Sequence, residues 1–293
     1  MKYALYLPNF GDGISTERLI DFAQLAEGAG WDGLFLWDHV AGHTVDFVDP
    51  WMALTAVALN TKRLRLGTTV TPLPRRRPWK LARETVTLDH VSQGRAVLGV
   101  GIGLRDAEWG DLGEETDLPT RGAMLDEALE VVTGLWSGEP FNFEGEHYRV
   151  KDAHFLPRPV QRPRIPVWVG GFWPNKAPFR RMARWDGIFP LFDEWEPEKV
   201  VPLLRDAVAF VKAHRAEDAG PFDVVVAGAT PGDEPAVAAE ITAAYADAGA
   251  TWWLEAIAPY RVGMDLEDPW PVEAFQARIR QGPPATTGKE TDA

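Results

Sequence analysis

The sequence contains no cysteine, which excludes disulfide bonds, thiolate nucleophiles and thiolate metal ligands. It also contains no apolar run that approaches about 18 residues, so we expect no transmembrane helix. The apolar run at the N-terminus is too short for a secretory signal and soon reaches Pro8. We therefore expect a cytoplasmic protein.

Positive charge is scarce as well. Lys and Arg number 30 against 43 Asp and Glu, which gives a net charge of −13. A surface that binds nucleic acid needs a basic excess, so we expect no nucleic-acid partner. The most compact basic run is Arg75–Arg77, and we interpret it first as a solvated loop, with an anion contact near an active site as the alternative.

Strand and helix patterns alternate along the whole chain. Short apolar segments resemble strands of a parallel sheet that is covered on both faces, and each is followed by a helical pattern or a helix start signal. The predicted strands are residues 3–8, 33–37, 64–70, 96–101, 166–169, 187–191, 223–227 and 251–255. The predicted helices are residues 16–28, 49–59, 78–92, 124–136 and 176–184, with others that begin at Pro197 and Pro235 and after Pro269.

Eight strand–helix units in one chain predict an α/β fold, a single (β/α)8 TIM barrel over residues 1–280. An open doubly wound sheet is the alternative, but no glycine-rich dinucleotide loop follows the first strand. We expect insertions after the fourth strand and before the fifth, where residues 138–165 would form a segment such as a hairpin over one rim. Residues 281–293 lack apolar anchors and are predicted to be a disordered tail.

The active site of such a barrel lies at the carboxyl ends of its strands. Asp38 and His39 follow the second strand, where they could perform acid–base chemistry because imidazole titrates near neutral pH. A simple loop cap is the alternative. The His and Asp residues of segment 38–49 could also bind a metal ion, but their spacing matches no ligand pattern and Asp49 is needed as a helix cap. We therefore predict no metal ligand.

Glycines and small hydroxyl residues follow three further strands. Thr68–Thr71 could bring backbone close to a ligand, although a strand running into a turn explains the pattern equally well. The Gly99–Gly103 loop is a weak phosphate-binding signal because no helix follows it at once. Gly170 and Gly171 precede a helix, and free backbone N–H groups there could bind a cofactor phosphate, unless the glycines only permit the turn.

Taken together, these motifs resemble those of the luciferase-like oxidoreductases, the bacterial luciferase superfamily. The resemblance is carried by LPNFG (7–11), AEGAGWDGLFLWDH (26–39), the segment 64–103, the segment 125–150, PRPVQRPRIPVWVGG (157–171) and RRMARWDGIFPL (180–191). It covers residues 1–191 through motifs and the rest through the strand–helix rhythm alone.

The resemblance implies a TIM barrel that uses FMN or the deazaflavin coenzyme F420. It implies a non-prolyl cis peptide between Thr69 and Val70 that presses against the cofactor ring. The predicted catalytic residues are Asp38 and His39 at the reactive edge of that ring. The predicted cofactor-binding residues are Asp38, Thr69, Val70, Thr71, Gly101, Gly170 and Gly171, the last two at the phosphate.

The resemblance implies hydride transfer to or from a small organic substrate with F420, with His39 moving a proton. With reduced FMN it implies oxygen insertion, and a flavin reductase would be a partner. Sugar-phosphate dehydrogenases of the family carry Glu where this sequence has Leu104, so the likeness does not extend to their substrate at this position. Relatives often form homodimers. A metal-dependent barrel hydrolase and a non-catalytic binding barrel are the competing hypotheses.

Overall fold

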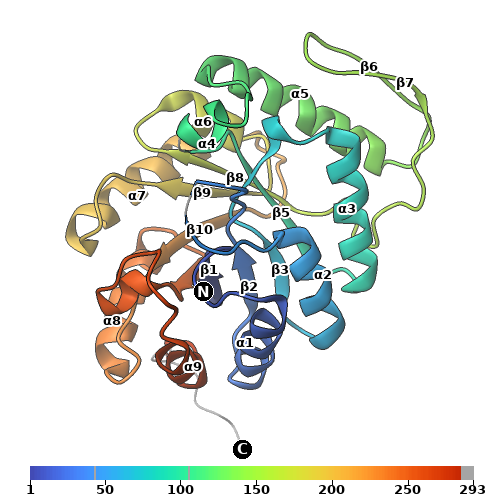
Figure 1. Ribbon diagram of the computed structural model, residues 1–293. Coiled ribbons are helices and arrows are strands. Elements are labelled where there is room, and N and C mark those ends of the chain that lie inside the picture. The colour runs from blue at the N-terminus through green and yellow to red at the C-terminus, as the bar shows by residue number, and fades with distance from the viewer. Residues whose placement is uncertain (43, 105, 285–293) are drawn as a thin grey trace, which may run out of the picture.

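The parallel strands close into a barrel with helices outside it (Figure 1). The structure is a computed structural model that describes residues 1–42, 44–104 and 106–284. The barrel strands are β1 (Lys2–Leu7), β2 (Gly33–Leu36), β3 (Arg65–Thr68), β5 (Ala96–Gly101), β8 (Val167–Phe172), β9 (Gly187–Leu191), β10 (Asp223–Gly228) and β11 (Trp252–Ala256). They neighbour one another in this order, and β11 pairs with β1 to complete the circle. The predicted TIM barrel is therefore confirmed.

The strand register separates two cores. Leu5, Leu34 and Leu66 lie side by side on neighbouring strands and belong to the large core between barrel and helices. Their neighbours along each strand, such as Ala4 and Phe35, face the barrel axis, because successive side chains of a strand point to opposite sides. The interior is filled by a second cluster of buried residues: Ala4, Phe35, Val97, Trp168, Phe189, Val225, Trp252 and Leu254. The barrel is thus a packed core whose ligands must bind at its mouth.

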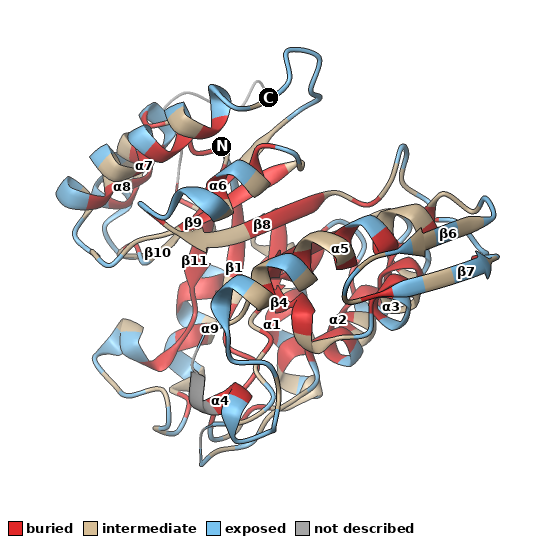
Figure 2. Ribbon diagram, turned by 90° about the horizontal axis from the view of Figure 1, so that it is seen from above, coloured by how far each residue is buried: buried red, intermediate tan, exposed pale blue. Residues whose placement is uncertain are grey.

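Helices cover the outside of the barrel, and their buried faces point inward (Figure 2). They are α1 (Thr16–Gly28), α2 (Pro50–Asn60), α3 (Pro78–Val91), α5 (Leu118–Trp136), α6 (Lys176–Met182), α7 (Pro197–Lys212), α8 (Pro235–Asp247) and α9 (Val272–Arg280), and the short helix α4 (Asp106–Gly110) follows β5. Ser15, Asp49 and Asp117 cap three of these helices, each accepting a hydrogen bond from a backbone N–H. None of the helices in the described ranges is both long enough and apolar enough to cross a membrane.

The helix α5 begins earlier than the sequence pattern indicated. Apolar periodicity is clear only from Leu125, but the cap at Asp117 starts the helix at Leu118. The first turn carries no apolar period, because its leucine, Leu118, is exposed and its buried residue is Arg121. The short helix α4, which lies between β5 and α5, was not predicted at all.

The insertion before β8 is a hairpin of β6 (Phe141–Glu144) and β7 (Arg149–Ala153), as expected. It does not lie over the barrel rim, however, but at the periphery beside α5 (Figure 1). Glu127 of α5 accepts hydrogen bonds from the backbone N–H groups of Glu146, His147 and Tyr148, which fasten the hairpin turn to the helix.

Packing continues beyond α9. The Gly282 carbonyl accepts a hydrogen bond of 2.7 Å from Arg278, and Pro284 is buried. The predicted disordered tail therefore does not begin at residue 281. Its remainder, residues 285–293, lies outside the described residues.

Gly99 in β5 tests how tightly the barrel strands pack. A Cβ atom there would lie 1.9 Å from the carbonyl oxygen of Thr68. We expect Gly99→Ala to lower the free energy of unfolding by about 2 kcal/mol or more, because the backbone must shift to admit the methyl group. Gly28→Ala is the matched control, since nothing lies within 4 Å of its Cβ position and alanine favours the helix. Urea denaturation of both variants checks this, and equal midpoints would contradict it.

Candidate active site

The floor of the barrel mouth is apolar. Tyr6, Val70, Leu191 and Ala227 are only partly buried and pack on the interior cluster from above. Tyr6, Leu191 and Ala227 lie at or near the carboxyl ends of their strands, and Val70 follows β3. The partly exposed layer is the surface that a ligand entering the mouth would meet.

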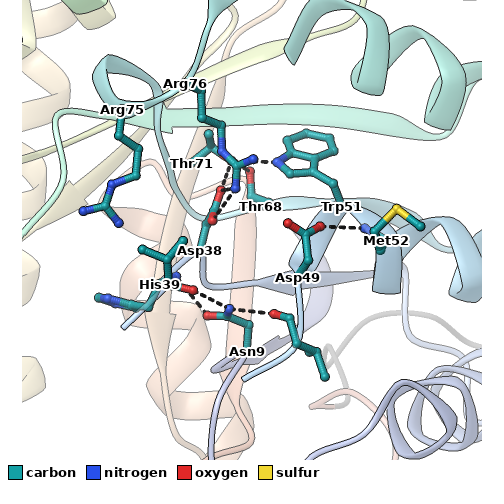
Figure 3. A network of polar contacts seen from close by, with 12 residues as sticks. Asn9, Asp38, His39, Asp49, Trp51, Met52, Thr68, Thr71, Arg75 and Arg76 are labelled. Carbon is teal, nitrogen blue, oxygen red and sulfur yellow. Dashed lines mark hydrogen bonds and ion pairs between the residues drawn. The ribbon is translucent and has the colours of Figure 1, made fainter. Parts of the chain in front are cut away.

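Asn9 fixes the chain that leaves β2. Its side chain is fully buried; Nδ2 donates to the carbonyl oxygens of His39 (2.8 Å) and Val48 (2.9 Å), and Oδ1 accepts from the N–H of His39 at 3.0 Å (Figure 3). Both backbone polar groups of His39 are thereby held. The histidine backbone is thus rigidly placed at the end of the strand.

The imidazole of His39 is oriented by a carboxylate. Its Nδ1 lies 3.0 Å from Oε2 of Glu108 on α4, and its side chain is only 16% exposed. Glu108 also accepts hydrogen bonds from the Val40 N–H (2.8 Å) and from Arg75 Nη1 (2.7 Å). Burial raises the pKa of Glu108, but the hydrogen bonds from His39, Val40 and Arg75 outweigh this and lower that pKa to about 2. The carboxylate is therefore ionised at neutral pH and holds the proton of His39 on Nδ1.

Asp38 is fully engaged in a second buried network. Its side chain is 0% exposed, and Nη2 of Arg76 lies 2.7 Å and 2.8 Å from its two oxygens. Thr71 Oγ1 donates to Asp38 at 2.7 Å (Figure 3), and Trp51 Nε1 in turn donates to Thr71 at 3.2 Å. The network ties the ends of β2 and β3 together.

The interpretation of Arg75–Arg77 as a solvated loop is wrong for two of the three residues. The side chains of Arg75 and Arg76 are only 4% and 17% exposed. The buried carboxylates of Glu108 and Asp38 need cations beside them, and the loop after β4 (Thr71–Pro72) supplies both. Arg77 alone is exposed.

The Thr69–Val70 peptide bond is cis, as the resemblance implied. Val70 lies between two of the glycines that the sequence singled out: a Cβ atom at Gly101 would be 2.8 Å from the Val70 side chain, and one at Gly170 would be 3.0 Å from it. The structure thus brings Val70, Gly101 and Gly170 together.

Gly171 faces the other way. A Cβ atom there would lie 2.6 Å from Pro178 of α6, so the glycine permits close packing of that helix on β8. Its predicted contact with a cofactor phosphate stays a prediction. Two buried polar atoms near the mouth, Thr69 Oγ1 and Trp37 Nε1, have no hydrogen-bond partner among the described residues.

The residues considered for a metal site have other roles. Asp38 pairs with Arg76, and Asp49 caps α2 by accepting from the Met52 N–H at 2.9 Å (Figure 3). His43 lies outside the described residues. Elsewhere in the described chain, no three His, Asp or Glu side chains converge as metal ligands would.

Sequence reasoning missed Glu108, the residue that orients His39. Glu108 stands in the connection after β5, where we expected an insertion but no site residue. The sequence signal that could have identified Glu108 is its position, a carboxylate a few residues after the Gly99–Gly103 loop. The ring of Trp109 packs on Gly103, where a Cβ atom would be 2.4 Å from the ring, and this contact docks α4 beside the mouth.

The fold and the site define a TIM-barrel protein with a carboxylate-held histidine at the carboxyl ends of its strands. Residues 1–289 match the sequence model of the luciferase-like monooxygenase family. The chain therefore belongs to the luciferase-like monooxygenase family.

Two curated relatives are F420-dependent glucose-6-phosphate dehydrogenases. The protein from Microbacterium testaceum is 35% identical over 227 residues, which cover 71% of this chain and 64% of that protein. The protein from Mycolicibacterium smegmatis is 34% identical over 207 residues, which cover 67% and 60%. The chain thus spans about three fifths of the length of these relatives.

Solved structures share the fold at low sequence identity. Monooxygenase RslO1 from Streptomyces bottropensis superposes with a TM-score of 0.78 at 21% identity, covering 96% of this chain and 97% of that one. The coenzyme F420 dependent tetrahydromethanopterin reductase from Methanopyrus kandleri gives 0.74 at 16% identity, with 96% of each chain covered. These likenesses establish the barrel fold.

Glu108→Gln should change how stability depends on pH. A carboxyl whose folded-state pKa lies below its ordinary value of 4.5 stabilises the fold when ionised. Its contribution is full above pH 4.5 and is lost as the pH falls toward 2. We expect Glu108→Gln to lower the free energy of unfolding by about 2 kcal/mol at pH 7 and by less at pH 3.

Urea denaturation at both pH values measures this difference. The control is Glu139→Gln, at an exposed position, whose free energy of unfolding should match that of the unmodified protein at both pH values. A constant penalty for Glu108→Gln from pH 7 to pH 3 would contradict the ionised, hydrogen-bonded carboxylate.

Proposed function

We propose that this protein is an oxidoreductase that binds coenzyme F420 or FMN in the barrel mouth and acts on a small organic substrate. With F420, which the named relatives use, the reaction is hydride transfer. The observation that carries the proposal is the His39–Glu108 pair at the end of β2. A histidine held in one tautomer by an ionised carboxylate is suited to moving a proton during such a transfer.

The residues at the mouth fit a flat ring system. Val70 offers an apolar platform between Gly101 and Gly170, both of which leave no room for a side chain beside it. The ring centroid of Trp37 lies 5.4 Å from that of Tyr6 and 6.0 Å from that of His39, so aromatic rings form one wall of the mouth. The buried Trp37 Nε1 and Thr69 Oγ1 could donate to the polar edge of a deazaflavin or flavin.

We assign Thr69, Val70, Gly101 and Gly170 to the ring and its attached chain, with Thr71 supporting them through Asp38. Gly171 would contribute its backbone at the phosphate. The coenzyme supplies the redox chemistry when bound. Asp38 acts by position in this scheme, because its carboxylate is already held by Arg76 and Thr71.

His39 is the residue that transfers a proton to or from the substrate in this scheme. Glu108 accepts from Nδ1–H, and Nε2 is then the ring nitrogen that exchanges a proton with the substrate oxygen. Glu108 keeps the ring orientation and tautomer fixed throughout, much as a carboxylate does in other carboxylate–histidine pairs.

With F420, the substrate is a small organic compound that gives a hydride to the cofactor or accepts one from it. The relatives act on glucose 6-phosphate, but Leu104, which is half exposed, stands where the resemblance places a glutamate in such dehydrogenases. We therefore do not extend the sugar phosphate to this chain. If FMN is the cofactor, the reaction is monooxygenation and a flavin reductase supplies reduced FMN. We expect a cytoplasmic homodimer in either case.

The choice of cofactor is tested by titrating the purified protein with F420 and, separately, with FMN while following fluorescence quenching. Saturable binding of F420 alone supports hydride transfer, and saturable binding of FMN alone supports monooxygenation. If neither cofactor binds, the redox proposal fails, and a metal-dependent hydrolase or a non-catalytic barrel takes its place.

His39→Ala should lower kcat by about 100-fold or more while leaving cofactor affinity within a few fold, because a general acid–base group acts in the chemical step. His154→Ala is the control, since that histidine is exposed on the segment after β7. Glu108→Gln should lower kcat less and shift the pH profile of kcat, as expected for a positioning residue. Full activity of His39→Ala with the bound cofactor would refute the assignment.

A further inference from the structure

The last inward-facing residues of the barrel strands form a ring around the mouth, and the residues assigned to the cofactor occupy one side of it. Val70, Gly101 and Gly170 belong to the side of β3, β5 and β8. The other side is formed by four neighbouring strands, β9, β10, β11 and β1. Its residues each lie two positions beyond a member of the interior cluster, so they face the same way. We call them the second arc: Leu191, Ala227, Ala256 and Tyr6.

The second arc is mostly apolar and is accessible from the mouth. Leu191, Ala227 and Tyr6 are partly exposed and pack on the interior cluster. Ala256 is buried and lies beside Tyr6 in the strand register. Because the two alanines carry only a methyl group each, a larger side chain at either position would extend into the mouth. A ligand that enters beside the cofactor therefore meets hydrocarbon on this side.

The buried charge at these strand ends lies behind the second arc. Glu255 stands between the inward residues Leu254 and Ala256 of β11, so it points out of the barrel, and its side chain is 0% exposed. Two arginines contact this carboxylate from outside the strands, Arg261 and Arg278. The cluster therefore does not offer its charge to a ligand in the mouth.

The loops that follow the four strands are acidic. They are residues 8–15, 192–196, 229–234 and 257–271, all within the described ranges. Their single Lys or Arg residue is Arg261, which is held by Glu255. Their acidic residues are Asp12, Asp193, Glu194, Glu196, Asp233, Glu234, Asp265, Glu267 and Asp268. Such an excess of one sign repels an anionic ligand.

A cationic ligand is disfavoured at the second arc for a different reason. None of the four arc residues carries a carboxylate that could pair with an ammonium group. The buried carboxylates of the rim, Asp38 and Glu255, are already paired with arginines. Burying an unpaired charge costs far more than burying an uncharged group. The arc therefore favours an uncharged ligand.

Exposed apolar side chains continue this surface on the loops after the same strands. Trp195, which follows β9, is 85% exposed, and Tyr260 and Val262, which follow β11, are 42% and 46% exposed. Apolar side chains that gather at the surface often mark a ligand-binding site. Here they extend the apolar surface of the second arc outward along the entrance.

Tyr6 is the one residue of the second arc whose side chain can form a hydrogen bond. Its ring and that of His39 both lie against Trp37. Burial raises the pKa of Tyr6, so its hydroxyl keeps its proton at neutral pH. A protonated phenol can donate to a carbonyl or alcohol oxygen.

We propose that the second arc binds the carbon body of an uncharged, largely apolar ketone or alcohol, and that Tyr6 donates a hydrogen bond to its oxygen. This inference rests on the proposed function, because it takes the substrate to lie beside the bound cofactor. Tyr6 and Ala227 then determine specificity: Tyr6 holds the oxygen, and Ala227 limits the size of the carbon body.

Calorimetric titration with ketones tests this on protein saturated with oxidised F420 or FMN, whichever binds. An oxidised cofactor and a ketone do not react by hydride transfer, so the titration measures binding alone. The probes are cyclohexanone, 4-ethylcyclohexanone, 4-oxocyclohexanecarboxylate and 4-(dimethylamino)cyclohexanone. We expect the ethyl group to tighten binding about tenfold, because it buries two more carbons. The anionic and cationic ketones should bind at least tenfold more weakly than 4-ethylcyclohexanone.

Two variants place the binding at the second arc. Tyr6→Phe should weaken all the uncharged ketones about fivefold, since it removes one hydrogen bond. Ala227→Val should weaken 4-ethylcyclohexanone more than cyclohexanone, because it fills space in the mouth. The matched controls are Tyr245→Phe, at a buried tyrosine of α8, and Ala153→Val, at a partly buried alanine that ends β7. Both controls should bind the ketones as the unmodified protein does.

Cofactor affinity is measured first for every variant, which keeps the two proposals apart. If neither F420 nor FMN binds the unmodified protein, the proposed function fails and this inference fails with it. If a cofactor binds but no ketone does, the substrate class alone is wrong. The same conclusion follows if a charged ketone binds as tightly as 4-ethylcyclohexanone, or if Tyr6→Phe and Ala227→Val match their controls.

Discussion

The site depends on the cost of burying negative charge. An unpaired carboxylate inside a protein costs several kcal/mol, so each buried carboxylate must meet a cation. Asp38 and Glu108 are both buried at the mouth, and the adjacent residues Arg76 and Arg75 pair with them. Two consecutive arginines thus serve two networks: one joins the ends of β2 and β3, and the other fixes α4 against His39.

These ion pairs connect structure to chemistry. The pairing with Arg75, with the hydrogen bonds from His39 and Val40, keeps Glu108 ionised, and an ionised Glu108 keeps His39 in one orientation.

The barrel itself could be predicted because its signals are local. Apolar strands such as Gly33–Leu36, and helix starts such as Asp49–Pro50, encode their structure within a few residues of sequence. The start of α5 and the short helix α4 were missed because neither has an apolar period. The hairpin was predicted, but not its place beside α5, because Glu127, which fastens the turn, lies about 20 residues earlier in the chain.

The sequence by itself determined the eight-strand rhythm, the family motifs and the strand ends where Asp38, His39 and Val70 lie. Only the tertiary structure decided what these residues contact. Glu108 reaches His39 across 69 positions of sequence and Arg76 reaches Asp38 across 38. Such pairs arise because barrel closure brings the ends of separate strands to one rim. Arg75 and Arg76, which look solvated in the sequence, are buried there, because the carboxylates that they neutralise come from distant parts of the chain.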